Sequence, residues 1–393
     1  MSSELYNDGP VVHTPTFIDG TSVEIPELKI LKQDGSIYEG SDMPDIDEEL
    51  AVKVYKTLAF HRALDERMVA SQRQGRLSFY MAALGEEAAS VGGAAGLKSQ
   101  DMIMSQYREQ GALMFRGFSL ENFMNQMFSN KEDLGKGRQM PIHYGSKELN
   151  YMTISSPLAT QIPQATGYAY GQKMQGLDEV TLCYFGEGAA SEGDFHAGLN
   201  MAAVQEAPVI FFCRNNGYAI STPSEEQFKG NGIASRGVGY GIKTLRVDGN
   251  DILAVIKATQ MARSYALKEN APVLIEAMSY RLGAHSTSDD PSGYRTREEE
   301  EKWQANDPLL RMKNWMLAQK WWDETQEVAL FESLREKILA AVKVSEKIDK
   351  PRIDALITDV YDVPSSQLEQ QLAQVKAHVN KYPEAYPFTA GKF

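Results

Sequence analysis

Three short apolar runs in the middle of the chain constrain its fold most strongly. They cover residues 180–185, 208–213 and 272–278, and a fourth, weaker run covers 244–247. These runs lack the alternation of apolar and polar side chains that marks a half-exposed strand, and helical patterns separate them. They therefore predict parallel strands that are buried on both faces. The expected fold class is α/β, with an open, mostly parallel sheet and helices on both of its faces.

The regions between and around these runs predict helices. Residues 47–74 contain neither Gly nor Pro and carry apolar side chains at a roughly helical spacing. Ser191 to Asp194 has the form of a capping box, which predicts a helix from there to Val204. Further helices are expected up to Lys268 and after Pro364.

The first 46 residues differ from the rest of the chain. They are rich in Gly, Pro and Asp and have only short apolar patches, so residues 1–46 are expected to form an irregular N-terminal arm. Residues 47–393 are then expected to form a single α/β domain. Its C-terminal helical region is expected to begin at about residue 298.

Charge and cysteine content argue against several classes of protein. The 393 residues include 53 acidic and 40 basic side chains, a net charge of −13, which disfavours nucleic acid and anionic membranes as partners. Cys183 and Cys213 each lie near the end of an apolar run, the pattern of reduced, buried thiols. Residues 1–20 carry three acids and no Lys or Arg, so neither a signal nor a transit peptide is expected, and a bacterium-like cytoplasm is the predicted location.

Polar residues follow the ends of three predicted strands: Glu187, then Arg214 and Asn216, then His285. Because ligands of open α/β sheets bind beyond the carboxyl ends of the strands, we expect these residues to lie together. Carboxylate and amide oxygens suit Mg²⁺, and an arginine with a nearby helix N-terminus suits a phosphate. The pattern predicts a site for a metal-bound diphosphate.

Other interpretations of the same residues stay open at this point. Gly186, Gly188 and Ser191 come one residue short of a dinucleotide-binding G-x-G-x-x-G motif, which alone is weak. A carboxylate at Glu187 would repel a pyrophosphate unless a divalent cation lay between them, which favours the metal–diphosphate interpretation. Glu187 and Asn216 could instead only cap helices, and the chain could be a non-catalytic scaffold that keeps the fold.

Longer segments resemble one family closely. Residues 186–194, 211–223 and 280–290 are similar to the α subunits of branched-chain 2-oxo acid dehydrogenases, within the family of thiamine-diphosphate-dependent first components. The resemblance extends over roughly residues 50 to 385, and it includes the segments 71–76, 106–108, 134–141, 154–163 and 247–251.

The resemblance implies thiamine diphosphate and Mg²⁺ as cofactors. It assigns Mg²⁺ to Glu187, Asn216 and the carbonyl of Tyr218, with Glu187 at a position where the widest family pattern has Asp. It assigns the diphosphate to Arg108, Arg214 and His285. The full implied cofactor-binding set is Gln106, Tyr107, Arg108, Ser156, Leu158, Gly186, Glu187, Gly188, Ala189, Arg214, Asn216, Tyr218, Ala219, Ile220 and His285.

The resemblance also implies catalytic roles and a second cation. His285 would assist acyl transfer, and Ser156 would act at the pyrimidine end of the cofactor beside Leu158. His143 and His196 are interpreted as structural, because neither follows a strand. A monovalent cation, K⁺ in some members, would be held by Ser155, Pro157, Thr160 and Gln161.

The implied activity is that of a 3-methyl-2-oxobutanoate dehydrogenase (2-methylpropanoyl-transferring), an oxidoreductase with a disulfide acceptor. Branched-chain 2-oxo acids would be decarboxylated and the acyl group passed to the lipoyl arm of an acyltransferase second component. We identify no glutamate here for the aminopyrimidine ring, so a β subunit is expected to provide it in an α₂β₂ assembly. A pyruvate or acetoin dehydrogenase α subunit is the alternative within the same chemistry.

Overall fold

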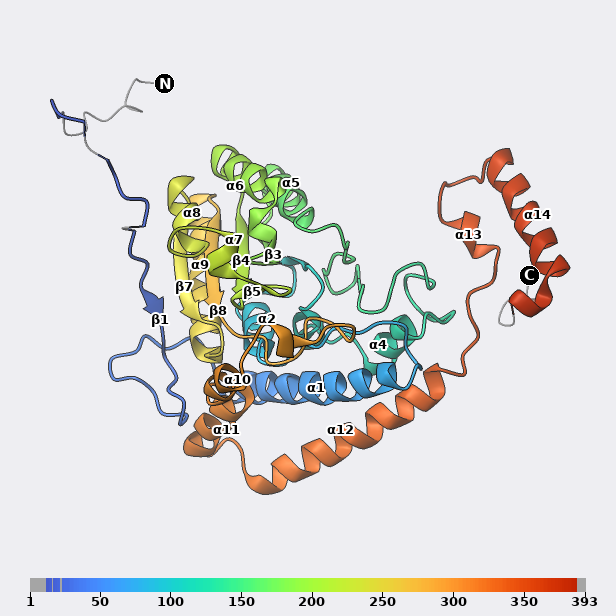
Figure 1. The fold of residues 1–393 in the computed structure, drawn as a ribbon, viewed down its shortest axis with the longest axis horizontal. Coiled ribbons are helices and arrows are strands. Elements are labelled where there is room, and N and C mark those ends of the chain that lie inside the picture. The colour runs from blue at the N-terminus through green and yellow to red at the C-terminus, as the bar shows by residue number, and fades with distance from the viewer. Residues whose placement is uncertain (1–11, 16, 22, 387–393) are drawn as a thin grey trace.

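A parallel sheet occupies the centre of the molecule (Figure 1). The computed structural model describes residues 12–386 except 16 and 22, and in this part of the chain the sheet has the order β1-β7-β8-β4-β3-β2 with every neighbouring pair parallel. The α/β fold class predicted from the sequence is confirmed. The strands are β1 (Glu27–Leu28), β2 (Met102–Met104), β3 (Thr181–Gly186), β4 (Val209–Asn215), β7 (Lys243–Asp248) and β8 (Val273–Met278).

The four strands predicted from apolar runs are β3, β4, β7 and β8. The two outer strands, β1 and β2, are two and three residues long, too short to produce an apolar run. A separate antiparallel pair, β5 (Tyr218–Ala219) and β6 (Thr222–Pro223), follows β4.

Alternate side chains of the central strands enter two different cores. Ile210 and Phe212 of β4 belong to a core with α1 (Glu48–Arg73), α2 (Glu87–Ala95) and α9 (Ile252–Glu269). Phe211 and Cys213 of the same strand belong to a second core with α5 (Gln161–Met174) and α6 (Gly193–Gln205). Because successive strand side chains point to opposite faces, the sheet is covered on both. Both cysteines are buried free thiols, as predicted.

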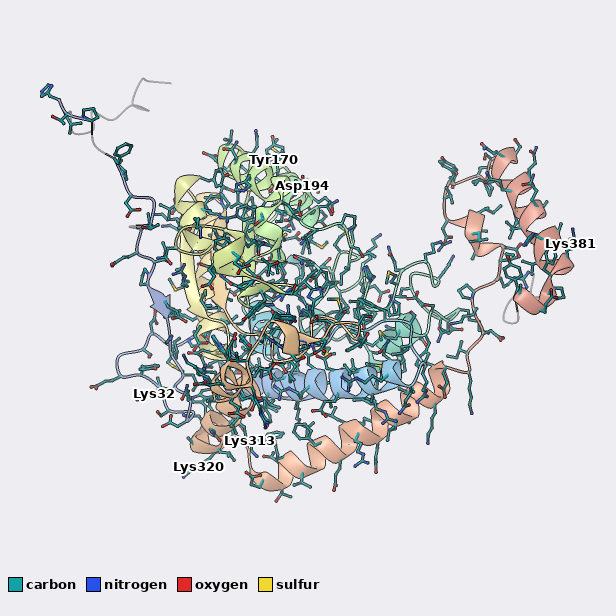
Figure 2. The ribbon with its side chains drawn as sticks, in the orientation of Figure 1. Lys32, Tyr170, Asp194, Lys313, Lys320 and Lys381 are labelled. Atoms are coloured by element: carbon teal, nitrogen blue, oxygen red, sulfur yellow. The ribbon has the colours of Figure 1, made fainter. Side chains whose placement is uncertain are left out.

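Smaller helices complete the layers, and the C-terminal helices extend them. In Figure 1, α12 runs below α1, and α13 and α14 lie away from the sheet. Lys136 and Arg138 form ion pairs with Asp359, directly after α13. Figure 2 shows Lys313 of α11 and Lys320, directly after this helix, on the opposite side from Lys381 of α14. None of the described helices is both long and apolar enough to span a membrane. The remaining helices are α3 (Gln110–Phe115), α4 (Leu120–Met127), α7 (Ser224–Gln227), α8 (Ala234–Gly239), α10 (Arg297–Gln304), α11 (Pro308–Gln319), α12 (Glu324–Ser345), α13 (Ala355–Thr358) and α14 (Ser366–Lys381).

The helix after β3 begins differently from the prediction. A 3₁₀ turn, Ala189–Ser191, comes first, and α6 begins at Gly193 without a side-chain cap from Glu192. The Ser191 hydroxyl accepts a hydrogen bond from Gln227 Nε2 at 3.1 Å instead of capping the helix. The predicted capping box is therefore wrong, because the chain needs a tight turn at the end of β3 before a helix can start.

One buried carboxylate attaches the N-terminal segment to the sheet. Asp251 Oδ1 caps α9 by accepting from the backbone N–H groups of Leu253 and Ala254. Its Oδ2 accepts from Ile30 and Leu31 N–H, each at 2.6 Å, beside the edge strand β1. The predicted arm of residues 1–46 lies partly outside the described residues, at positions 1–11, 16 and 22.

We expect Asp251→Ala to lower the free energy of unfolding by about 3 kcal/mol or more, because it leaves buried N–H groups of two segments unpaired. Urea denaturation of the full chain measures the loss. Asp47→Ala is the matched control: this exposed residue caps α1 at Leu50 N–H only, so we expect a loss of about 1 kcal/mol. Equal losses in the two variants would contradict this account of Asp251.

Candidate functional site

The loops after four adjacent strands converge at one edge of the sheet. Residues 106–108 follow β2, Glu187 follows β3, Asn216 follows β4, and the segment 281–285 follows β8. The pairings Gly186–Arg214 and Asn215–Met278 place the ends of β3, β4 and β8 level with one another. Parallel strands thus bring the predicted residues to one place, as the sequence pattern indicated.

Glu187 presents a buried oxygen that no described protein group satisfies. The side chain is 1% exposed, and its Oε2 accepts from Asn216 N–H at 3.3 Å, whereas Oε1 has no hydrogen-bond partner in the described part of the chain. Burial, with a contribution from the nearby Glu86 carboxylate, raises the pKa of Glu187 to about 7. An unpaired buried carboxylate of this kind raises the free energy of the folded state, and a bound cation would lower it again.

The loop that carries Asn216 is held by hydrogen bonds at every residue. Asn216 Oδ1 accepts from Tyr218 N–H at 3.1 Å, and its Nδ2 donates to Glu86 Oε1 at 3.1 Å. The neighbouring Asn215 accepts from the N–H of Gly217, whose φ of 83° favours glycine, and donates to the buried Glu276. The backbone of Asn216 to Tyr218 is therefore fixed beside Glu187.

Arg214 is engaged by two buried carboxylates. Its Nη1 donates to Glu86 Oε1 at 2.6 Å and its Nε donates to Glu109 Oε1 at 2.5 Å. The charges of Glu109 and Glu86 outweigh burial and raise the pKa of Arg214. The sequence analysis assigned Arg214 to the diphosphate and missed both acids. In the sequence, Glu86 is marked only by its place before the small-residue segment 88–96.

A second cationic group surrounds His285. Arg108 Nη2 lies 3.3 Å from His285 Nδ1 and donates to its carbonyl at 2.9 Å, and Arg281 Nη1 lies 3.4 Å from the same nitrogen. Burial and then the charges of the two arginines lower the pKa of His285 to about 4. Two buried guanidinium groups beside one neutral imidazole favour the binding of an anion. Sequence reasoning found Arg108 and His285 but missed Arg281, which lies in the same matched segment.

The other predicted cofactor-binding residues line these loops. Gln106 Oε1 accepts from Gly186 N–H at 2.9 Å, and the Tyr107 ring meets that of His285 edge-on at 6.3 Å. A side chain at Gly188 would press on Ala219, with 3.0 Å between the two Cβ atoms. Ala189 is buried in the 3₁₀ turn, and Ile220, 55% exposed, accepts from Arg281 through its carbonyl at 2.6 Å.

Residues 155–161 form their hydrogen bonds with groups other than Glu187, Asn216 and His285. Within the described residues, Ser156 bonds to His143, and Leu158 is 38% exposed. Thr160 Oγ1 donates to the Pro157 carbonyl at 2.9 Å, and the buried Gln161 has an unpaired Oε1. Ser155 is exposed. His196, interpreted as structural, bonds to Tyr240 at 2.8 Å.

Comparison with protein families matches residues 55–354 to the dehydrogenase E1 component. The chain belongs to this family. Proteins named 2-oxoisovalerate dehydrogenase subunit alpha, mitochondrial, are 51% identical in Macaca fascicularis over 374 residues, covering 95% of this chain and 83% of the relative, and 50% identical in Dictyostelium discoideum over 365 residues, covering 92% and 83%. The Arabidopsis thaliana subunit alpha 2 is 48% identical over 383 residues, covering 96% and 81%.

The comparison corrects one expectation. These relatives are named as mitochondrial proteins, which contradicts the predicted cytoplasmic location. The prediction rested on the charge of residues 1–20 and on the two reduced thiols, and neither feature distinguishes these compartments.

We expect the His285 imidazole to stay neutral from pH 8 down to about pH 5.5, because its pKa is lowered by burial, Arg108 and Arg281. Arg281→Gln should raise this pKa by removing a positive charge, and Asp289→Asn should lower it further, since Asp289 favours the charged form. ¹³C-histidine NMR titration measures both shifts, and His285→Gln identifies the signal. A wild-type titration midpoint near pH 6.5 would contradict the lowered pKa of His285.

Proposed function

We propose that this chain is the α subunit of a branched-chain 2-oxo acid dehydrogenase first component, an oxidoreductase that decarboxylates substrates such as 3-methyl-2-oxobutanoate. The observation that carries the proposal is identity of about 50% over 95% of the chain to relatives named for this activity. The buried cationic and carboxylate groups at the sheet edge agree with it.

Thiamine diphosphate is the cofactor that this family uses, and it fits the groups present. A diphosphate carries about three negative charges at neutral pH, and Arg108 with Arg281 supplies two buried positive charges on one side of the site. When bound, the cofactor supplies the nucleophilic carbon and the electron sink for decarboxylation. Arg108 and His285 would bind and orient its diphosphate, with Gln106 and Tyr107 beside them.

Mg²⁺ would be held by Glu187, Asn216 and the Tyr218 carbonyl. The unpaired Glu187 Oε1 supports this assignment, since a hard oxygen ligand is available there without breaking a hydrogen bond. Within the described residues no three His, Cys, Asp or Glu side chains cluster as a metal site. The amide, a backbone carbonyl and diphosphate oxygens would have to complete the coordination.

We propose that Arg214 supports the diphosphate site chiefly by pairing with the carboxylates of Glu86 and Glu109.

For K⁺, the unpaired buried Oε1 of Gln161 supports a site with Ser155, Pro157 and Thr160. The Pro157 carbonyl oxygen already accepts from Thr160, so its second lone pair would have to coordinate the cation. Ser156 and His285 are proposed as the catalytic residues of this chain.

A β subunit is the partner that an α subunit of this family requires. An exposed apolar surface on α5 and α6 supports such an interface, with Tyr170 of α5 and Asp194 of α6 on the same outer side in Figure 2. The lipoyl arm of an acyltransferase second component would receive the acyl group. The exposed apolar side chains are Tyr168, Tyr170 and Met174 of α5, Leu177 shortly after it, and Met201 and Val204 of α6.

We also propose residues 47–393 as one domain.

We expect Glu187→Gln to weaken Mg²⁺-dependent binding of thiamine diphosphate by about a hundredfold, because the charged ligand is lost. Without cofactor, the same variant should melt no lower than wild type, since it removes an unpaired buried carboxylate. Calorimetric titration and thermal melting of the chain co-expressed with its β partner measure the two effects. Glu192→Gln, at an exposed position five residues away, should change neither. Unchanged binding by Glu187→Gln would refute the ligand role.

We expect the chain co-expressed with its β partner to turn over 3-methyl-2-oxobutanoate faster than pyruvate, and the chain alone to be inactive. Reduction of an artificial electron acceptor during decarboxylation measures both. A preference for pyruvate would support the pyruvate dehydrogenase alternative and leave the cofactor assignment standing. Full turnover by the chain alone would exclude an essential β subunit.

A further inference from the structure

Ser156 and His143 form a side-chain pair that lies outside the Glu187 and His285 clusters. His143 is 6% exposed, and its Nε2 contacts the hydroxyl oxygen of Ser156. The other ring nitrogen, Nδ1, lies 3.1 Å from the carbonyl oxygen of Pro141. Sequence reasoning treated this histidine as structural, because it follows no strand.

The Pro141 carbonyl determines which nitrogen of the ring carries the proton. A carbonyl oxygen can only accept a hydrogen bond, so Nδ1 must be the protonated nitrogen of the neutral ring. Nε2 then has a free lone pair and can only accept. The Ser156 hydroxyl must therefore donate its single proton to His143.

The backbone on both sides holds the pair in place. Ile154 N–H donates to the Tyr144 carbonyl at 3.0 Å, and Ser146 and Tyr151 form an antiparallel bridge, so the two chain segments run side by side. Gln126 accepts from Ile142 N–H at 3.0 Å and donates to the Met140 carbonyl at 2.7 Å. The buried Ile142 has a φ of 71°, a conformation that costs free energy for a β-branched residue.

We propose that His143 is a positioning residue that makes Ser156 a hydrogen-bond acceptor toward the cofactor. Because its hydroxyl donates to His143, the oxygen of the exposed Ser156 can only accept further hydrogen bonds. The chemistry that such an oxygen recognises is an N–H donor, which the amino group on the pyrimidine end of thiamine diphosphate supplies. This inference rests on the proposed function, because Ser156 was assigned to that end of the cofactor.

The first test needs no cofactor and no turnover. ¹⁵N-histidine spectra of the full chain with its β partner should show one ring, absent in His143→Asn, as the Nδ1–H tautomer. Ser156→Ala should move the Nε2 signal of that ring and leave the signals of the other five histidines in place. An Nε2–H tautomer, or no shift in Ser156→Ala, would overturn the pairing whatever the enzyme does.

The second test uses two substitutions of His143 whose amide groups lie at different distances from the backbone. Gln carries its amide where Nε2 lies and keeps an acceptor for Ser156, whereas Asn carries its amide where Nδ1 lies and loses it. We expect His143→Asn to lower kcat for 3-methyl-2-oxobutanoate by about tenfold with little change in KM, and His143→Gln to recover most of that loss.

A double-mutant cycle separates positioning from folding. In a Ser156→Ala background, His143→Asn should have no further effect on kcat, because the hydroxyl through which it acts is gone. Additive losses, or equal losses in Asn and Gln with lowered melting temperatures, would make His143 merely structural. Failure of the proposed function would look different, since the wild-type assembly itself would then not decarboxylate the substrate.

Discussion

The buried pairing of Arg214 with Glu86 and Glu109 is the interaction on which the site depends. Glu109 also accepts from the N–H groups of Gln106, Tyr107 and Arg108 through its other oxygen. One arginine at the end of β4 thus fixes the loop after β2 and the segment before α2. Loss of one member of such a group leaves a buried charge unpaired, which costs about 3–5 kcal/mol. The charges of Arg214 and Arg108 outweigh burial and keep the pKa of Glu86 below its usual range.

The central strands could be predicted because they are long enough to form continuous apolar runs. The outer strands could not, since β1 and β2 contain too few residues and are defined by pairing with distant partners. The predicted cap at Ser191 failed for a related reason. A local motif competes with the turn that the end of β3 requires, and the hydroxyl bonds to Gln227 instead.

The candidate site likewise contains residues that the sequence predicted and residues that it did not. The convergence of Glu187, Asn216 and His285 at one sheet edge was predictable, because Glu187 and Asn216 directly follow β3 and β4 and His285 lies on the segment after β8. Glu86, Arg281 and His143 were not predicted to belong to the candidate site, because their contacts are with partners far away in the sequence or across a loop. Spacing along the chain does not reveal which cation is already paired with a buried acid. The geometry shows that both arginines meet Glu86, Arg214 Nη1 at 2.6 Å and Arg108 Nε at 3.6 Å.

The separate position of α13 and α14 has a thermodynamic consequence. Within the described part of α14 only Val379 is buried, and Val360, Tyr361 and Val363 of the connecting segment are 49–75% exposed. In α13 only Ile357 is buried, and the exposed ion pairs of Lys136 and Arg138 with Asp359 add little stability. The free energy of local unfolding of α13 and α14 is therefore expected to lie well below that of the sheet core, so this region should exchange its amide hydrogens first.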